Sequence, residues 1–361
     1  MKTKIKKYAI NLLLLLFSIS LVLILFEIYL RYDSIIIYDE QLGYKLKPNS
    51  IKTFNFGVNY TIKINSDGLR DREFGEKDND TFRILFLGDS FTFGWSNNIE
   101  NTYVKLLEKK LVSSNLNTNF EVVNAGVFGY GPSQELYMLK NLKKKYNPDL
   151  VLMQFYINDI FQNYGYSNKK DKYYVRRKIE LFGFLSDIKE NLLRNIEPHN
   201  SEFLIELIPR NLLSKNYQMG DKREWELTEK ILLNIENDIR DINKSFAIVI
   251  IPNWGQIYLN YTFAVNKSFL TQYTKNFIKE DMINLIESGD LDKPNKLLKS
   301  FGNKYDIVVI DPLLEFRESA LKNENLYLLP KDFHLSAKGN QVVAEVIYRE
   351  LIKNQLVPDK K

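Results

Sequence analysis

The sequence has 361 residues, of which 45% are hydrophobic and 26% are charged, a composition typical of a folded protein and unlike that of disordered or collagen-like chains. It contains no cysteine, which excludes a disulfide framework, a thiol nucleophile and a thiolate-bound metal. The formal net charge is +5, and only two histidines, His199 and His334, are present. A mechanism that needs an imidazole base therefore has two candidates.

The excess positive charge lies at the N-terminus. Residues 1–7 contain four lysines and no acidic residue, and the rest of the chain is almost neutral. A nucleic-acid-binding protein would instead carry a basic patch on its folded domain. We therefore expect no nucleic-acid partner, and we interpret residues 1–7 as a cytoplasmic basic tail.

Residues 8–30 form an apolar stretch that is long enough to cross a membrane. A helix of this length would rise roughly 34 Å, and the hydrocarbon core of a bilayer is about 30 Å thick. The preceding lysines predict a single-pass anchor in the cytoplasmic (inner) membrane of a bacterium, with the N-terminus inside and the folded domain on the periplasmic or extracellular side. A cleaved signal peptide is the alternative, but Glu27, Tyr29 and Arg31 stand where small residues would mark a cleavage site. Glu27 and Arg31, four residues apart, are expected to pair.

Two further regions follow the apolar stretch. Alternating and turn-rich stretches over residues 31–80 predict a juxtamembrane segment of strands and loops. Residues 81–355 contain five short apolar runs typical of buried parallel strands, separated by amphipathic helical patterns. These runs are Ile84 to Leu87, Phe120 to Val123, Leu150 to Phe155, Phe246 to Ile251 and Ile307 to Ile310. Their alternation predicts an α/β domain whose five-stranded parallel sheet is covered on both faces.

Polar residues follow these strands at the edge where a parallel sheet usually binds its ligands. Ser90 follows the first strand, Gly129 lies in a glycine-rich loop after the second, and Asn158 follows the third. Asp332 and His334 lie in a loop that comes after the fifth strand. One hydroxyl, one glycine loop, one carboxamide and one imidazole at a single rim predict an acyl-transfer site.

Each of these residues has a chemical role in such a site. His334 can take the proton of the Ser90 hydroxyl and make it nucleophilic, and Asp332 can fix the tautomer of the imidazole. The backbone N–H groups of Ser90 and Gly129 and the side-chain amide of Asn158 can form an oxyanion hole. The expected mechanism requires neither a metal nor an organic cofactor.

The four segments resemble the four sequence blocks of the SGNH/GDSL hydrolases over residues 81 to 355. The resemblance assigns the family's named residues to Ser90, Gly129, Asn158 and His334, and it implies a three-layer α/β/α flavodoxin-like fold with ester hydrolysis or O-acyl transfer. Residues 65–71 also resemble the lead-in of membrane-anchored bacterial members. There are two departures. Lys331 occupies the usual place of the aspartate, three residues before the histidine, and Phe91 replaces a leucine.

An insertion at about residues 164–245 is longer than an ordinary crossover between strands. Its basic and aromatic residues are compatible with a lid over the site, and a solvated helical hairpin is the alternative. Trp254 could stack on a sugar or fill the core. His199 has no catalytic context and is interpreted as a solvated loop residue.

These observations predict a membrane-anchored serine esterase with a Ser-His-Asp acyl-enzyme mechanism. Its partners would be the bacterial membrane and an exported ester, an acylated glycan or lipid. Two alternatives share the same residues: an O-acyltransferase that modifies cell-envelope polysaccharide, and a catalytically silent scaffold that binds glycan.

Overall fold

The computed structural model describes residues 2–56, 58–114, 118–160, 180–182, 184–185, 188, 219–258, 290–328 and 332–358. The chain divides into two compact units. One comprises residues 1–47 and 169–198, and the other comprises residues 48–168 and 199–361.

The first unit begins with a long apolar helix, α1 (Lys2–Asp33), in which residues 4–33 are long and apolar enough to cross a membrane. The expected pair near its end is present, because Arg31 Nε lies 2.6 Å from Glu27 Oε1. The Glu27 carboxylate also accepts the backbone N–H of Leu181 at 2.8 Å. A short antiparallel hairpin follows, made of β1 (Ile36–Asp39) and β2 (Gly43–Leu46).

The second unit is built on a five-stranded parallel sheet with the strand order β6-β5-β7-β8-β9. Its strands are β5 (Thr81–Gly88), β6 (Asn119–Gly126), β7 (Leu150–Phe155), β8 (Ser245–Ile250) and β9 (Val308–Ile310). Each includes most or all of one predicted apolar run, and the predicted α/β fold is confirmed. The run Ile84 to Leu87 is completely buried, as expected for a strand that is covered on both faces.

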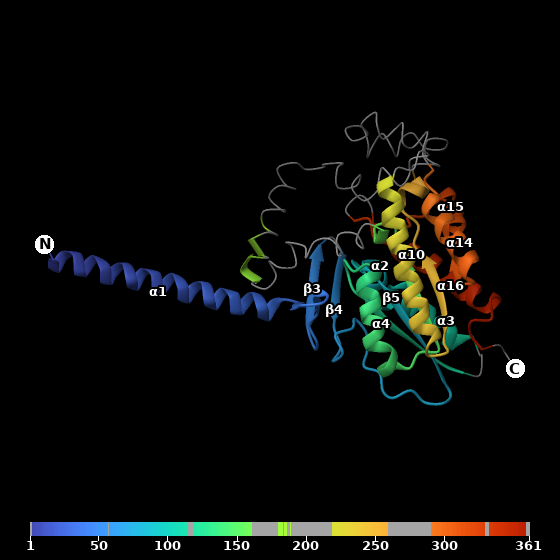
Figure 1. Cartoon of the computed structure of the whole chain (residues 1–361), viewed down its shortest axis with the longest axis horizontal. Helices are drawn as coiled ribbons and strands as arrows, with labels where there is room; N and C mark the ends of the chain where they lie inside the picture. The colour runs from blue at the N-terminus through green and yellow to red at the C-terminus, as the bar shows by residue number, and fades with distance from the viewer. Residues whose placement is uncertain are drawn as a thin grey trace. The chain divides into compact units, whose positions relative to one another are not determined.

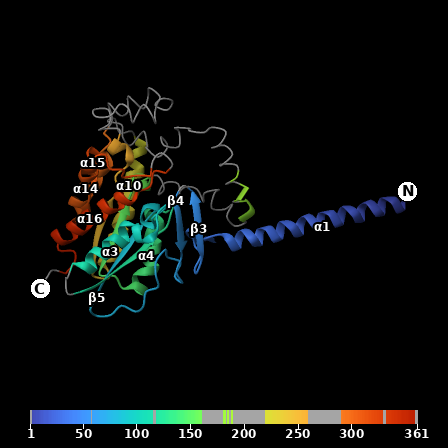
Figure 2. The ribbon, with the colours of Figure 1, turned by 180° about the vertical axis from the view of Figure 1, so that it is seen from behind.

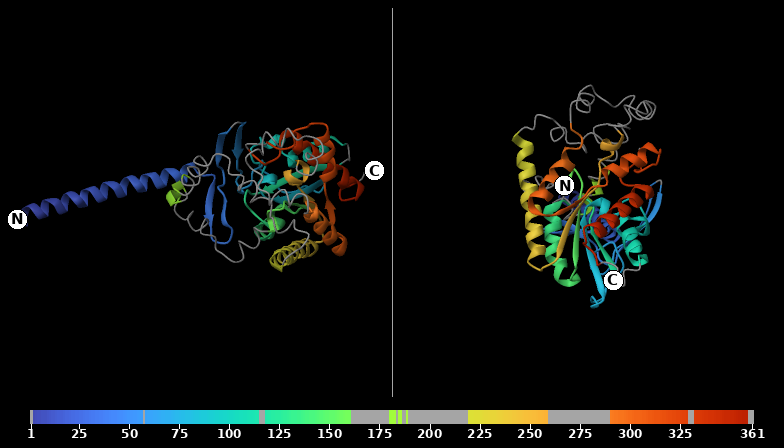
Figure 3. Two further views of the ribbon diagram at one scale, coloured as in Figure 1. Left: turned by 90° about the horizontal axis from the view of Figure 1, so that it is seen from above. Right: turned by 90° about the vertical axis from the view of Figure 1, so that its right-hand side faces the viewer.

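Helices cover both faces of this sheet. Within the described residues of the second unit, the helices with established bounds are α2 (Ser90–Phe93), the 3-10 turn η1 (Ile99–Asn101), α3 (Tyr103–Ser113), α4 (Pro132–Tyr146), α10 (Met219–Arg240), α14 (Lys293–Tyr305), α15 (Leu313–Leu321) and α16 (Ala337–Lys353). Helix α4 packs against α10 (Figure 1), and α3 packs against α16 (Figure 2). The sheet lies between these two pairs (Figure 3), which gives the three layers of the fold.

A second hairpin precedes the sheet in the same unit. It pairs β3 (Ile51–Phe56) with β4 (Val58–Lys63) in antiparallel register, so that Phe54 lies opposite Tyr60. Phe54 and Tyr60 stack with their ring centroids 5.4 Å apart, and Tyr60 is almost completely buried. The aromatic side chain of Tyr60 therefore packs into the second unit.

Candidate active site

Ser90 is placed by the transition from strand β5, which lies between β6 and β7, to the short helix α2. The Asp89 carboxylate caps this helix by accepting the N–H of Phe91 at 2.8 Å, and Gly94 ends it in the left-handed conformation. Asp89 N–H in turn donates to Gln154 Oε1 on β7 at 3.0 Å. Ser90 is thus held at the carboxyl end of the sheet in the first turn of a helix.

His334 comes from the loop before α16, at the other end of the second unit's sequence. Leu328 N–H donates to the His334 carbonyl at 2.9 Å, and Ser336 caps α16 by accepting the N–H of Gly339 at 3.1 Å. These bonds place the imidazole so that its Nε2 lies 2.7 Å from Ser90 Oγ. The hydroxyl and the imidazole singled out in the sequence therefore meet at hydrogen-bonding distance.

Asp332 completes this chain of contacts. Its Oδ1 lies 2.6 Å from His334 Nδ1 and also accepts the His334 backbone N–H at 3.0 Å. With the proton on Nδ1, the imidazole presents an acceptor to the Ser90 hydroxyl. Burial opposes ionisation of Asp332, but its hydrogen bonds with His334 and Ser96 and the charge of His334 lower the pKa of its carboxyl below the usual value.

Aromatic rings hold the imidazole from two sides. The Phe333 ring stacks on His334 with a centroid distance of 4.4 Å, and the Phe91 ring lies 5.0 Å away. The Phe91 ring also packs against the Tyr156 ring, with a centroid distance of 4.5 Å. The phenylalanine that replaces the family's leucine therefore packs against the histidine.

The strand order places the loops of Gly129 and Asn158 on the two sides of β5, because β6 and β7 are its neighbours. Gly126 ends β6 so close to α2 that a Cβ atom there would lie 2.4 Å from the backbone nitrogen of Phe93. Gly129 has a φ of 73°, a conformation that favours glycine. Asn158 is half-buried beside a tight turn in which the Asp159 carboxylate accepts the Tyr156 N–H at 2.8 Å.

Three carboxyl groups next to these elements are buried almost completely: Asp89, Glu135 in the first turn of α4, and Asp159. Burial raises the pKa of Asp89 to about 6. Burial, together with the negative charge of Asp89, raises the pKa values of Glu135 and Asp159 well above their usual range. We therefore expect Glu135 and Asp159 to retain their protons at neutral pH, whereas Asp89 is mostly ionised there.

A sequence comparison identifies the family. The sequence model for GDSL-like Lipase/Acylhydrolase matches residues 84–347, which is well over half of the chain. The chain belongs to the GDSL family. This GDSL protein is accordingly a hydrolase of ester bonds that uses a serine.

Solved structures that resemble this GDSL hydrolase are distant from it in sequence. An acetyl xylan esterase, AlAXEase, is 15% identical with a TM-score of 0.40, over 75% of this chain and 100% of that chain. LAE5, an α/β hydrolase from the metagenome of Lake Arreo in Spain, is 14% identical with a TM-score of 0.44, over 76% of this chain and 95% of that chain. A G-D-S-L family protein from Veillonella parvula is 13% identical with a TM-score of 0.40, over 75% of this chain and 99% of that chain. A search of curated proteins found no match.

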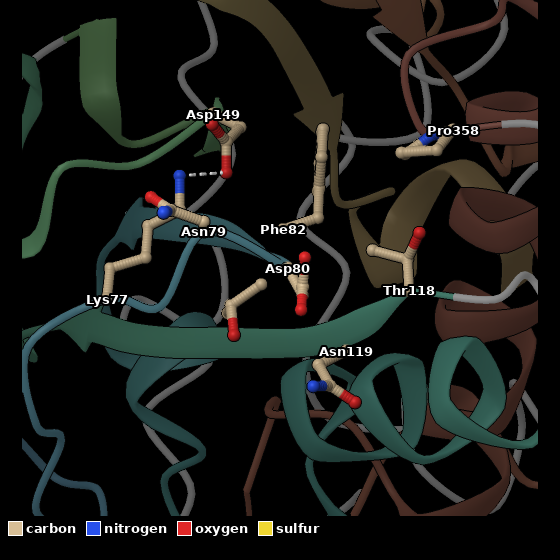
Figure 4. Close-up of a pocket in the computed structure, with 9 residues that line it drawn as sticks. Lys77, Asn79, Asp80, Phe82, Thr118, Asn119, Asp149 and Pro358 are labelled. Atoms are coloured by element: carbon tan, nitrogen blue, oxygen red, sulfur yellow. Dashed lines mark hydrogen bonds and ion pairs between the residues drawn. The ribbon is translucent and has the colours of Figure 1, made fainter.

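Other candidate positions of the GDSL hydrolase lie away from these contacts. Trp254 packs against the hydrophobic core, as one of its two sequence interpretations expected. A polar cavity of about 580 Å³ lies at the amino end of the sheet, where Lys77 pairs with Asp149 (Figure 4), and it is remote from Ser90. Among the described residues, no group of three or more His, Asp or Glu side chains is arranged to hold a metal ion. Lys331, His199 and most of the insertion at 164–245 lie outside the described residues.

The sequence interpretation missed several residues around the site. The Ser96 hydroxyl donates to Asp332 Oδ2, although Ser96 follows no predicted strand. The buried carboxyls of Asp89 and Asp159 adjoin Ser90 and Asn158, so their position next to the motif residues was an available signal. Glu135 carried no comparable signal, because only folding brings it close to Asp89.

Proposed function

We propose that this chain is a membrane-anchored serine esterase in which Ser90 is the nucleophile, His334 is the general base and Asp332 orients the imidazole. One observation carries the proposal. The contacts from Ser90 Oγ to His334 Nε2 at 2.7 Å and from His334 Nδ1 to Asp332 Oδ1 at 2.6 Å form a continuous hydrogen-bonded chain, in which the imidazole can take the serine proton while the aspartate holds its tautomer.

The proposed reaction has two acyl-transfer steps. His334 Nε2 takes the Ser90 proton while Oγ attacks the ester carbonyl, and the tetrahedral intermediate collapses as His334 gives that proton to the leaving alkoxide oxygen. An acyl ester on Ser90 and a free alcohol result. His334 then deprotonates water as it attacks the acyl carbon. The bond between this carbon and Ser90 Oγ breaks as His334 passes the proton to Oγ, which releases the carboxylic acid and restores Ser90. An acceptor hydroxyl in place of this water would make the same chain an O-acyltransferase.

The oxyanion formed in each step needs hydrogen-bond donors. We assign this role to the backbone N–H groups of Ser90 and Gly129 and to the Asn158 amide. The neighbouring positions of β5, β6 and β7 support the assignment, since the loops after these strands carry all three residues. Loss of one such donor typically costs about 2.7–4 kcal/mol in the activation barrier.

We further propose that α1 anchors the enzyme in the cytoplasmic membrane and that the hydrolase domain acts outside it on an exported ester, an acylated glycan or lipid. The length and apolar composition of α1 support the anchor. The lysines that precede its apolar stretch support the orientation, because positive residues favour the cytoplasmic side.

The catalytic proposal is tested with the full chain in mild detergent and an activated acetyl ester as substrate. We expect Ser90→Ala to abolish turnover and labelling by a serine-reactive phosphonate, and Ser113→Ala, on the exposed end of α3, to leave both unchanged. If Ser90→Ala kept the activity, the assignment would be wrong. Failure of the wild type to react with the phosphonate would favour a catalytically silent scaffold. Formation of an acylated glycan, when a glycan is added to the assay, would favour the O-acyltransferase.

The orientation is tested by cysteine labelling, because the natural chain has no cysteine. Lys4→Cys and Lys353→Cys place one thiol at each end of the chain. We expect a membrane-impermeant maleimide to label only Lys353→Cys in cells with a permeable outer layer, and labelling of Lys4→Cys alone would reverse the orientation.

A further inference from the structure

The second oxygen of the Asp332 carboxylate, Oδ2, has a specific partner. Oδ1 receives both bonds from His334, whereas Oδ2 accepts the Ser96 hydroxyl. A carboxylate that is bound through one oxygen alone can rotate about its Cβ–Cγ bond. The contact at Oδ2 opposes this rotation and keeps Oδ1 directed at the imidazole.

Ser96 adopts a backbone conformation that a serine rarely takes. Its φ is 60°, in the left-handed region that L-residues with a side chain usually avoid. Such conformations persist only where the surrounding structure imposes them, and they are concentrated at functional sites. The hydrogen bonds that hold the loop around Ser96 therefore also fix the position of the Ser96 hydroxyl.

Arg70 supplies most of these bonds. It is completely buried, and its guanidinium donates to the carbonyls of Phe93 at 2.9 Å, Gly94 at 2.6 Å and Asn97 at 2.6 Å. These three carbonyls bracket Ser96 in sequence. The planar guanidinium thus sets the path of the loop on both sides of the serine.

Asn97 and Tyr60 also hold this loop. Asn97 Nδ2 donates to the Leu335 carbonyl at 2.9 Å, which ties the loop to the segment that carries His334. The buried Tyr60 on β4 interacts with both the side chain and the backbone of Ser96, and its ring packs beside Trp95. Ser96 is therefore fixed between the β3–β4 hairpin and the histidine loop.

We propose that Ser96 is a positioning residue for the catalytic acid, and that Tyr60 and Arg70 extend this support into residues that precede the matched family region. The inference rests on the proposed roles of Ser90, His334 and Asp332. It explains how an aspartate two residues before the histidine, rather than at the usual place three residues before it, is held in a productive orientation. It also gives Tyr60 and Arg70 a supporting role in the placement of Asp332.

The test compares Ser96→Ala with Ser96→Gly in the full chain. Both variants remove the hydroxyl, but only glycine relieves the left-handed backbone. We expect kcat for the activated ester to fall roughly tenfold to a hundredfold in both variants, as for loss of a hydrogen bond to a charged group, with KM unchanged. Wild-type kcat in Ser96→Gly would show that only the backbone matters, and would overturn the proposal.

A double-mutant cycle with Asp332→Asn separates positioning from general loss of folding. If Ser96 acts through Asp332, Ser96→Ala will reduce kcat much less in the Asp332→Asn background than in the wild type. Equal fold-losses in both backgrounds would overturn the proposal. Ser90→Ala in the same assay keeps the two hypotheses apart, because activity that survives in Ser90→Ala contradicts the proposed function rather than the role of Ser96.

Discussion

Replacing Asp89 by asparagine tests whether burial raises the pKa of the carboxyl beside Ser90 in the folded protein. The substitution removes the ionisable group but keeps an oxygen that can cap α2, because asparagine is as good a capping residue as aspartate. Burial raises the pKa of Asp89 from 3.8 to about 6. The folded wild type therefore binds a proton more tightly than the unfolded chain does over this range.

The sign of the effect follows from proton linkage. Because the pKa is higher in the folded state, the unfolding free energy of the wild type falls as pH rises from about 4 to about 6, and the loss is complete above that range. A shift of roughly two pKa units corresponds to about 3 kcal/mol. Asp89→Asn lacks this loss, so it should gain about 3 kcal/mol over the wild type between pH 4 and pH 8.

Urea unfolding of the full chain in detergent, followed by tryptophan fluorescence at several pH values, measures this difference. Asp241→Asn, which removes an exposed carboxylate at the end of α10, is the matched control and should show the wild-type pH dependence. Parallel pH profiles for Asp89→Asn and the wild type would refute the reasoning, since they would mean that Asp89 ionises alike in both states.

Two further substitutions examine the proposed oxyanion hole. Asn158→Ala should lower kcat roughly a hundredfold to a thousandfold with an unchanged Tm, as measured by ester hydrolysis and thermal unfolding, and an undiminished kcat would remove Asn158 from the site. Gly126→Ala should lower both Tm and activity, because its Cβ would lie 2.4 Å from the Phe93 nitrogen and 2.6 Å from Thr92 Cβ. A wild-type Tm for Gly126→Ala would show that α2 moves aside without cost.

The sequence was sufficient to predict the sheet and the central contacts of the site. The run Ile84 to Leu87 is continuous and apolar because helices cover both faces of β5, and this burial made it recognisable as a parallel strand. Ser90 could be located because ligand-binding residues of such sheets follow the strands. His334 could be chosen because the chain has only two histidines.

The supporting residues could not be predicted in the same way. The role of Ser96 depends on a left-handed backbone and on a contact with Asp332 that spans 236 positions in the sequence. Arg70 acts through backbone carbonyls, which every residue has, so no pattern of residue types indicates it. Local periodicity reports which face of an element is buried, whereas these contacts depend on how distant loops meet.

The separation of Ser90 from His334 has a consequence for when the enzyme becomes active. Their side chains meet across 244 positions of the sequence, and the histidine lies just before the C-terminal helix α16. A chain is synthesised from its N-terminus, so the serine and all five strands of the sheet emerge before His334, the proposed base. Ester cleavage should therefore begin only when the last segment has docked. Hydrolytic activity then indicates that folding is complete. An incompletely synthesised chain does not hydrolyse the esters that it encounters.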